Sequence, residues 1–243
     1  MKRFNTTFTI ALAISALALA TAYADGESHP AAPSNYIWYD SLQELHELCR
    51  LKYRQSRRYE DYARHAAEQH DPDAAALFRA MSRADAVQCA NCRKAIESLG
   101  GKFYAPVTVP VQPVSVGEHL ARALRDKDDY HSRRMAHCID CAVADGNRYI
   151  ARMLTWCDAS DVRQIIILRR ELARLNASAD DGSLFRFAGY AADGLPADGA
   201  FGSDARPVLY SVCPKCGNVT ESDGATRYCP HCMTDGCDFA TFR

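Results

Sequence analysis

Apolar side chains recur every three or four positions along four stretches of the chain, 41–69, 71–99, 115–145 and 147–176. This spacing gathers them on one face of an α-helix. Two of the stripes also carry polar members: the second runs through Phe78, Met81, Asp85, Gln88, Cys92, Ile96 and Leu99, and the fourth through Ile150, Met153, Cys157, Asp161, Gln164, Leu168, Leu172 and Leu175. Four amphipathic helices of about thirty residues predict a mainly α fold, a four-helix bundle.

The ends of these stretches carry helix-capping signals. Ser41 and Ser115 are each followed three residues later by a glutamate, which is the capping-box pattern of a helix N-terminus. Asp71-Pro72 places an N-cap before a proline at the first helical position, and Gly100-Gly101 ends that helix. The connection at 102–114 is rich in valine and proline and is long enough to run the length of a bundle.

Residues 1–24 have the three parts of a secretory signal peptide. Lys2 and Arg3 form a basic start, an apolar run follows from Phe8 to Ala20, and Ala22-Tyr23-Ala24 is a small-x-small cleavage pattern. The apolar run is too short to cross a bilayer, so a membrane anchor is the weaker interpretation. We expect the mature chain to be exported to the periplasm, free of the membrane, in a compartment that permits disulfides.

The C-terminal residues 208–243 carry two Cys-x-x-Cys pairs with twelve residues between them. Each pair can direct two thiolates at one centre, and two pairs close a tetrahedral sulfur site. We therefore predict a small metal knuckle in which one iron or zinc ion is held by Cys213, Cys216, Cys229 and Cys232. Iron would make the knuckle a one-electron carrier, whereas zinc would be structural. Two disulfides are the alternative.

Charge and residue content narrow the function further. The 29 basic and 30 acidic side chains balance, which gives no electrostatic case for nucleic acid or an anionic membrane as a partner. The 11 cysteines are an odd number, so some are metal ligands or some thiols stay free. Cys237 stays open as a buried residue, a free thiol or a disulfide partner. Histidines without ligand spacing are expected on solvated faces: His65, His70, His119 and His131.

This organisation resembles the rubrerythrin family, in which a ferritin-like four-helix bundle precedes a rubredoxin-like domain. The resemblance covers 41–176 by architecture and 208–243 by its cysteine motif, with a linker at 177–207 and an N-terminal segment at 25–40. It implies a homodimer and a long crossover between the second and third helices. It also implies reduction of peroxide by electrons that pass from the rubredoxin iron to two irons in the bundle. The redox partner is unknown.

The chain departs from the family at the di-iron ligands, which are glutamates on the first and third helices and Glu-x-x-His on the second and fourth. Lysines and Asp-x-x-Gln motifs occupy the corresponding positions: Lys52, Asp85 with Gln88, Lys127, and Asp161 with Gln164. An ammonium group cannot bind a metal cation, so a di-iron centre is not expected. We predict that the two lysines and two aspartates neutralise one another inside the bundle. Surface charges in a shifted register are the alternative.

Six more cysteines fall within the bundle, most of them on the inward stripes: Cys49, Cys89, Cys92, Cys138, Cys141 and Cys157. Three interpretations stay open. The cysteines are small buried residues with disulfides that staple helices, ligands of a soft metal such as Cu(I) or zinc, or a redox dithiol at Cys89/Cys92 or Cys138/Cys141.

Together these features predict an exported, rubrerythrin-like metalloprotein that transfers electrons through an iron held by four cysteines and lacks the usual di-iron peroxidase site. Whether it is an oxidoreductase stays open. The alternative is a non-enzymatic metal-binding or scaffold protein. In that case the knuckle holds structural zinc, and the bundle is stapled by disulfides or binds Cu(I).

Overall fold

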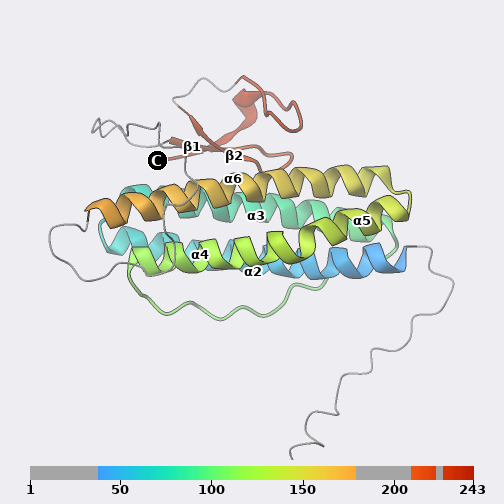
Figure 1. The fold of residues 1–243 in the computed structure, drawn as a ribbon, viewed down its shortest axis with the longest axis horizontal. Coiled ribbons are helices and arrows are strands. Elements are labelled where there is room, and N and C mark those ends of the chain that lie inside the picture. Colours follow the sequence, from blue (N-terminus) through green and yellow to red (C-terminus); the bar gives the residue numbers. More distant parts are fainter. Residues whose placement is uncertain (1–37, 179–208, 223–226) are drawn as a thin grey trace, which may run out of the picture. The chain divides into compact units, whose positions relative to one another are not determined.

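A computed structural model of the chain describes residues 38–178, 209–222 and 227–243 (Figure 1). The predicted signal peptide and nearly all of the predicted N-terminal segment and linker lie outside the described residues. Within the described part of the chain, no helix is long and apolar enough to cross a membrane.

Four long helical rods form the bundle that the sequence predicts (Figure 1). The first is α2 (Tyr39–Glu68), the second is α3 (Pro72–Ser98) and the fourth is α6 (Arg148–Ser178). The third rod consists of α4 (Val116–Tyr130), a π-helical turn (His131–Met135) and α5 (Ala136–Ala144). The crossover at 102–114 lies against α2, where the backbone N–H of Val111 donates to Asp61 at 2.9 Å.

Two of the three predicted helix caps form. Asp71 accepts a hydrogen bond from the N–H of Ala74 at 2.9 Å, and Ser115 accepts one from Glu118 at 3.2 Å. The predicted cap at Ser41 is wrong, because α2 already begins at Tyr39. Ser41 is buried, and its hydroxyl donates to the carboxylate of Asp145, just beyond the end of the third rod. A tertiary contact thus replaces the local capping signal.

A layer of buried polar side chains divides the bundle core into two apolar halves. One half gathers around Tyr59, Phe78 and Leu124. The other gathers around Leu48 and Ile96 and contains five cysteines. The polar layer has one or two members from each rod, none more than 3% exposed: Lys52, Asp85, Gln88, Lys127, Asp161 and Gln164.

His65 and His119 are buried, not solvated as the sequence suggested. Nδ1 of His65 lies 3.1 Å from Nε2 of His119, and the two rings stack. Burial lowers the pKa of His119 to about 4, so this ring is neutral at pH 7. The contact joins α2 to α4, and therefore no spacing along one helix could have revealed it.

The C-terminal knuckle contains a three-stranded antiparallel sheet in the order β2-β1-β3. Its strands are β1 (Leu209–Val212), β2 (Val219–Ser222) and β3 (Ala240–Phe242), and a 3₁₀ turn (Gly236–Asp238) precedes the last. Tyr210, Val212 and Val219 share one apolar cluster with bundle residues, so the sheet packs on the bundle.

Candidate metal centre and buried ion tetrad

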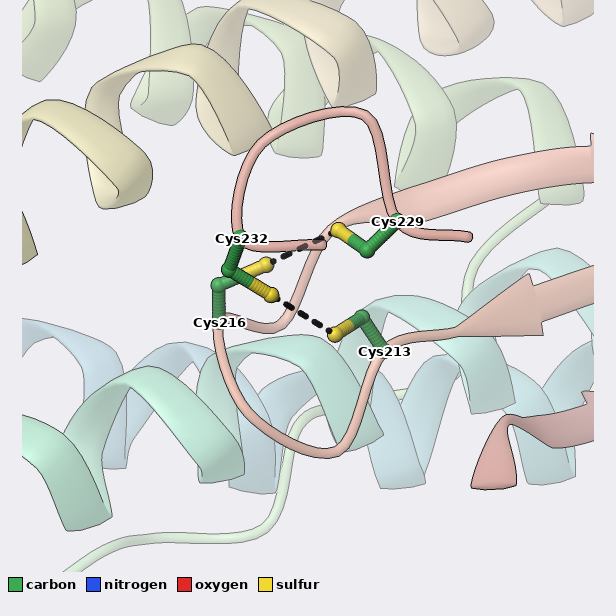
Figure 2. Close-up of side chains that lie close together, drawn as sticks. All are labelled: Cys213, Cys216, Cys229 and Cys232. Atoms are coloured by element: carbon green, nitrogen blue, oxygen red, sulfur yellow. Dashed lines mark hydrogen bonds between the residues drawn. The ribbon is translucent and has the colours of Figure 1, made fainter. Parts of the chain in front are cut away.

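The four predicted ligand cysteines converge in the knuckle (Figure 2). Their sulfur atoms all lie within 4.8 Å of one another, and all four side chains are buried. Cys213 Sγ is 3.5 Å from Cys232 Sγ, and Cys216 Sγ is 3.4 Å from Cys229 Sγ. A tetrahedron with metal–sulfur bonds of about 2.3 Å has edges of about 3.8 Å, so this sulfur quartet fits one iron or zinc ion.

Two equivalent turns place these sulfurs. The N–H of Gly217 donates to the carbonyl of Cys213 at 3.0 Å, and the N–H of Met233 donates to the carbonyl of Cys229 at 3.0 Å. Gly217 and Met233 both have positive φ angles, 77° and 59°. Each Cys-x-x-Cys segment therefore closes through a left-handed residue just after its second cysteine, which folds both sulfurs of the pair to the same side.

The charge of the quartet depends on a cation. A hydrogen bond from Cys216 lowers the pKa of Cys213 to about 4 against the effect of burial, and backbone N–H groups add to this. Burial raises the pKa of Cys229 to about 11. Without a metal, the buried sulfurs thus share protons, because several thiolates at this separation repel one another. A bound dication would remove that repulsion and release the protons.

Hydrogen bonds hold the knuckle against α3 and α6. The side-chain amide of Asn91 donates to the carbonyl of Lys215 at 2.8 Å, and Ser160 Oγ donates to the carbonyl of Gly217 at 2.9 Å. A Cβ atom on Gly217 would lie 2.7 Å from the carbonyl oxygen of Ala84, so glycine permits this close approach. The first Cys-x-x-Cys turn is thereby fixed on the bundle surface.

A small cavity lies where the quartet meets the bundle. Cys216 lines it from the knuckle, and Cys92 and Cys157 line it from α3 and α6. It has room for about one water molecule. Gln88 also lines it, and both side-chain amide atoms of Gln88 lack a hydrogen-bond partner within the described part of the chain. The knuckle sulfur and two bundle thiols thus face one small space.

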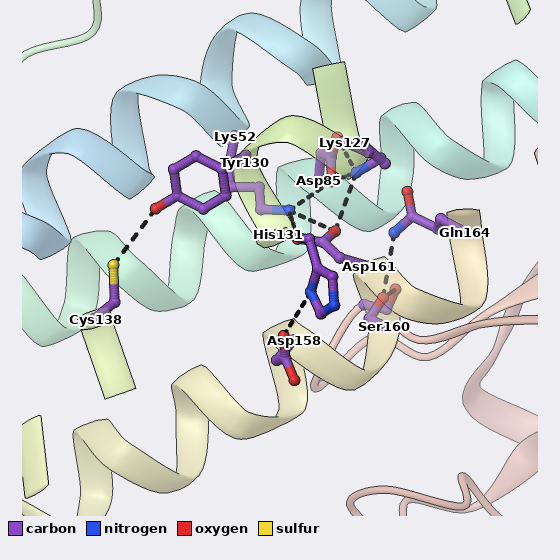
Figure 3. A network of polar contacts seen from close by, with 11 residues as sticks. Lys52, Asp85, Lys127, Tyr130, His131, Cys138, Asp158, Ser160, Asp161 and Gln164 are labelled. Carbon is purple, nitrogen blue, oxygen red and sulfur yellow. Dashed lines mark hydrogen bonds and ion pairs between the residues drawn. The ribbon is translucent and has the colours of Figure 1, made fainter. Parts of the chain in front are cut away.

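The two lysines and two aspartates of the polar layer form one ion tetrad (Lys52, Asp85, Lys127 and Asp161; Figure 3). Lys52 Nζ lies 2.5 and 2.6 Å from the carboxylate oxygens of Asp161 and 3.4 Å from Asp85. Lys127 Nζ lies 3.1 and 3.2 Å from the oxygens of Asp85 and 3.1 Å from Asp161. Each ammonium bridges both carboxylates, which confirms the predicted neutralisation and excludes the surface register.

The tetrad is charged and self-neutralising. Burial would lower the pKa of Lys52 and Lys127, but attraction to Asp161 and Asp85 outweighs it and places both above the ordinary lysine value. Burial would likewise raise the pKa of Asp161, and the two lysines hold it below the ordinary aspartate value instead. Two positive and two negative charges therefore coexist in a layer that water does not reach.

Five bundle cysteines share the apolar half beyond the tetrad, and we call them the thiol cluster: Cys49, Cys89, Cys92, Cys138 and Cys157. Cys138 Sγ lies 3.6 Å from Tyr130 Oη and donates to Glu44 at 3.2 Å. All 11 cysteines of the chain are free thiols in the structure.

The predicted redox pairs within single helices are not the ones the structure brings into contact. Cys49 on α2 and Cys89 on α3 have their Sγ atoms 3.6 Å apart. The sequence offered no signal for this pair, since its members lie on different helices and their meeting depends on how those helices pack.

Known structures share the fold of this chain, although sequence comparisons find no relative. No family model and no curated protein matches the sequence. A fully reduced, all-ferrous nigerythrin structure matches with a TM-score of 0.66 and 15% identity, over 84% of this chain and 87% of that one. A mixed-valence nigerythrin structure matches with a TM-score of 0.65 and 16% identity, over 84% of this chain and 86% of that one. An open-pore ferritin from the archaeon Archaeoglobus fulgidus matches with a TM-score of 0.51 and 12% identity, over 58% of this chain and 87% of that one. This chain therefore has the fold of nigerythrin, a rubrerythrin-family protein, with a ferritin-like bundle followed by a rubredoxin-like knuckle.

Proposed function

We propose that this protein is a rubrerythrin-like metalloprotein that carries single electrons through one iron ion held by the sulfur quartet. The convergence of four buried cysteine sulfurs within 4.8 Å is the observation that carries the proposal. A closed tetrahedral sulfur site suits iron, which can cycle between two oxidation states without a change of ligands. The knuckle residues supply the ligands, and the bundle contacts at Lys215 and Gly217 fix the site's orientation.

The ion tetrad replaces a di-iron centre in this proposal. A carboxylate-bridged iron pair needs several anionic or imidazole donors, whereas this layer offers two carboxylates, both already bound to ammonium groups. Adding two dications beside Lys52 and Lys127 would leave a strongly positive, buried layer. The glutamines at 88 and 164 are poor substitutes for histidine ligands. The bundle then acts as a rigid support for the knuckle and does not bind a second redox metal.

The proposal also includes export. The basic start, apolar run and cleavage pattern within residues 1–24 support removal of a signal peptide after Ala24. N-terminal sequencing of the protein from its native host would give Asp25 as the first residue. An intact Met1 would contradict export by this route.

Metal content and visible absorption test the electron-transfer role on the full chain. We expect about one iron per chain and a red protein that dithionite bleaches. A colourless protein with about one zinc would overturn electron transfer and favour the structural-knuckle scaffold. The substitution Cys213→Ser with Cys216→Ser should remove the metal and the colour, with the helical circular dichroism signal retained.

The same double variant tests the tetrad. Because its knuckle cannot hold metal, any remaining iron must be bound in the bundle. We expect almost none. About two irons per chain in that variant would show that the polar layer still holds a di-iron centre.

A further inference from the structure

A groove lies on the bundle surface between α2 and the third rod, beside the π-helical turn. Arg54 and Gln55 of α2 line one side, and Arg125 of α4 and Ser132 of the π-helical turn line the other. Its volume of about 840 Å³ is that of pockets which hold small organic molecules. No described residue of the knuckle lines it, so the electron-transfer proposal makes no use of this groove.

The acidic side chains of the groove are already neutralised. Five arginines and three aspartates line it. Each aspartate is bound by an arginine, in the pairs Asp126–Arg58, Asp129–Arg133 at 2.8 Å and Asp128–Arg169 at 3.0 Å. One more arginine of the groove, Arg134, is bound to Glu44 at 2.7 Å. These pairs leave no negative charge in the groove for its other arginines.

The two remaining arginines, Arg54 and Arg125, form no ion pair within the described part of the chain. Both are exposed, and they come from different helices, so the groove has an uncompensated positive charge on each side. Guanidinium groups bind carboxylates and phosphates through paired, charge-assisted hydrogen bonds. The groove therefore favours a ligand with two negative charges.

Gln55 gives the groove a buried amide that lacks a partner. Its side chain lines the groove but is only 2% exposed, and its Oε1 has no hydrogen-bond partner among the residues that the structure describes. A buried polar atom without a partner lowers stability, so few are retained in folded proteins. Rotation of the amide exchanges its oxygen and nitrogen, and a ligand hydroxyl can donate to the one or accept from the other. A hydroxyl at this position would satisfy Gln55 in either orientation.

We propose that this groove binds a small organic dianion that carries a hydroxyl group. Arg54 and Arg125 hold the negative charges, and the hydroxyl pairs with the amide of Gln55. Leu51 and the ring of Tyr130 also line the groove and contact the carbon skeleton of the ligand. Malate, a hydroxy-dicarboxylate, and glycerol 3-phosphate, a phosphate ester, both have this chemistry, and they serve as probes that separate a carboxylate ligand from a phosphate ligand.

Calorimetric titration of the full mature chain, with zinc in the quartet, tests this site independently of electron transfer. Each probe is compared with a molecule that lacks its hydroxyl: malate with succinate, and glycerol 3-phosphate with inorganic phosphate. We expect malate or glycerol 3-phosphate to bind with a dissociation constant below about 1 mM. The preferred probe should bind about tenfold more tightly than its partner molecule, because the partner leaves the Gln55 amide unpaired.

Two arginine substitutions assign the charge contacts. Arg54→Gln and Arg125→Gln should each weaken binding of the preferred probe about tenfold or more, since each removes a charge-assisted hydrogen bond. Arg152→Gln is the matched control, because Arg152 is an exposed arginine of α6 that does not line the groove, and its loss should leave the affinity unchanged. Added salt should weaken binding to the parent chain.

The substitution Gln55→Met separates a role in ligand binding from a role in folding. Methionine is similar in length to glutamine and has no amide to leave unpaired, so the melting temperature of the ligand-free protein should stay the same or rise. The preference for the hydroxyl-bearing probe over its partner molecule should disappear. A glutamine that serves only the fold would give the opposite pair of results, a lower melting temperature and an unchanged preference.

Three results would overturn the proposal. One is a dissociation constant above about 1 mM for both hydroxyl-bearing probes. Another is an equal loss of affinity in the Arg152 variant and in the Arg54 and Arg125 variants, which would mean that the anion binds to surface charge in general. The third is equal affinity of the parent chain for each probe and for its partner molecule.

Discussion

The sulfur quartet and the ion tetrad are both buried groups of four ionisable side chains, yet they solve the problem of buried charge in opposite ways. The quartet consists of four groups that become negative together, so it is incomplete without a cation. The tetrad contains its own cations, because Lys52 and Lys127 neutralise Asp85 and Asp161. The charge of a buried site in this fold can thus be balanced by a metal ion or by side chains. The identity of the side chains decides which.

The largest expected effect comes from removing one cation of the tetrad. Lys52→Met leaves two buried carboxylates with one ammonium, which should lower the free energy of unfolding by about 3–5 kcal/mol. Urea denaturation followed by circular dichroism measures the change. Lys94→Met on α3 is the control, because Lys94 is exposed and the same substitution there should change stability little.

A cost no larger than that of the Lys94 variant would mean that the tetrad is not a tightly coupled charge group. The added change Asp161→Asn, which restores the charge balance, should cost less in combination than the two single changes do together.

Replacing both cations by anions should turn the tetrad into a site like the quartet. The variant Lys52→Glu with Lys127→Glu carries four carboxylates in the polar layer and needs a divalent cation. Mn²⁺ at about a hundred times its dissociation constant should stabilise this variant by about 2.7 kcal/mol, read as a rise in melting temperature. The parent chain, with its quartet filled by zinc, should not respond. An equal response from both would place the Mn²⁺ site elsewhere.

The pH dependence of stability should show two limbs from the tetrad. The pKa of Asp161 in the folded protein lies below its ordinary value of 3.8. Its ionised carboxylate therefore adds to the free energy of unfolding above pH 3.8, and this contribution is lost as the pH falls through the pKa of the folded protein. The pKa of Lys52 in the folded protein lies above its ordinary value of 10.5. Its ammonium group therefore adds to the free energy of unfolding below pH 10.5, and this contribution is lost as the pH rises through the pKa of the folded protein. Denaturant titrations across pH measure both limbs.

The variant Asp161→Asn should weaken the acid limb selectively. An acid limb of undiminished size in that variant would assign the loss of stability to other carboxylates. Between about pH 5 and pH 9, the contribution of the tetrad to the free energy of unfolding should stay constant.

The smallest effect concerns the attachment of the knuckle to the bundle. Gly217→Ala strains a residue with φ of 77° and places a Cβ 2.7 Å from the carbonyl of Ala84, so we expect a local cost of about 1 kcal/mol or more. Faster hydrogen exchange in β1 and β2 measures it. Gly146→Ala is the matched control, because its φ is 70° and nothing lies within 4 Å of the added atom. Equal effects at the two positions would mean that contact with α3 contributes nothing.

Several of these features could be predicted from the sequence because short-range rules govern them. The four helices follow from apolar spacing, and the quartet follows from two Cys-x-x-Cys pairs. The tetrad was also predictable, since the Lys…Asp-x-x-Gln pattern occurs twice at nearly the same separation. A fold with this pseudo-repeat places equivalent residues of its two halves at the same level of the bundle.

Other features escaped prediction because they depend on contacts between helices. The π-helical turn at His131–Met135 interrupts what the sequence predicts as one regular helix. The loss of the predicted cap at Ser41 accompanies its contact with Asp145, and the burial of His119 accompanies its contact with His65 on α2. The partners of Ser41 and His119 lie far from them along the chain.

The sequence by itself determined the helices, the knuckle and the residue types available at the centre of the bundle, because backbone hydrogen bonding and side-chain periodicity act over a few residues. Only the tertiary structure decided that Cys49 meets Cys89, and that Cys216 shares a cavity with Cys92 and Cys157. Such contacts between side chains of different elements depend on the rotation and axial position of each helix. These are fixed by the packing of the whole core and are not encoded in any single segment.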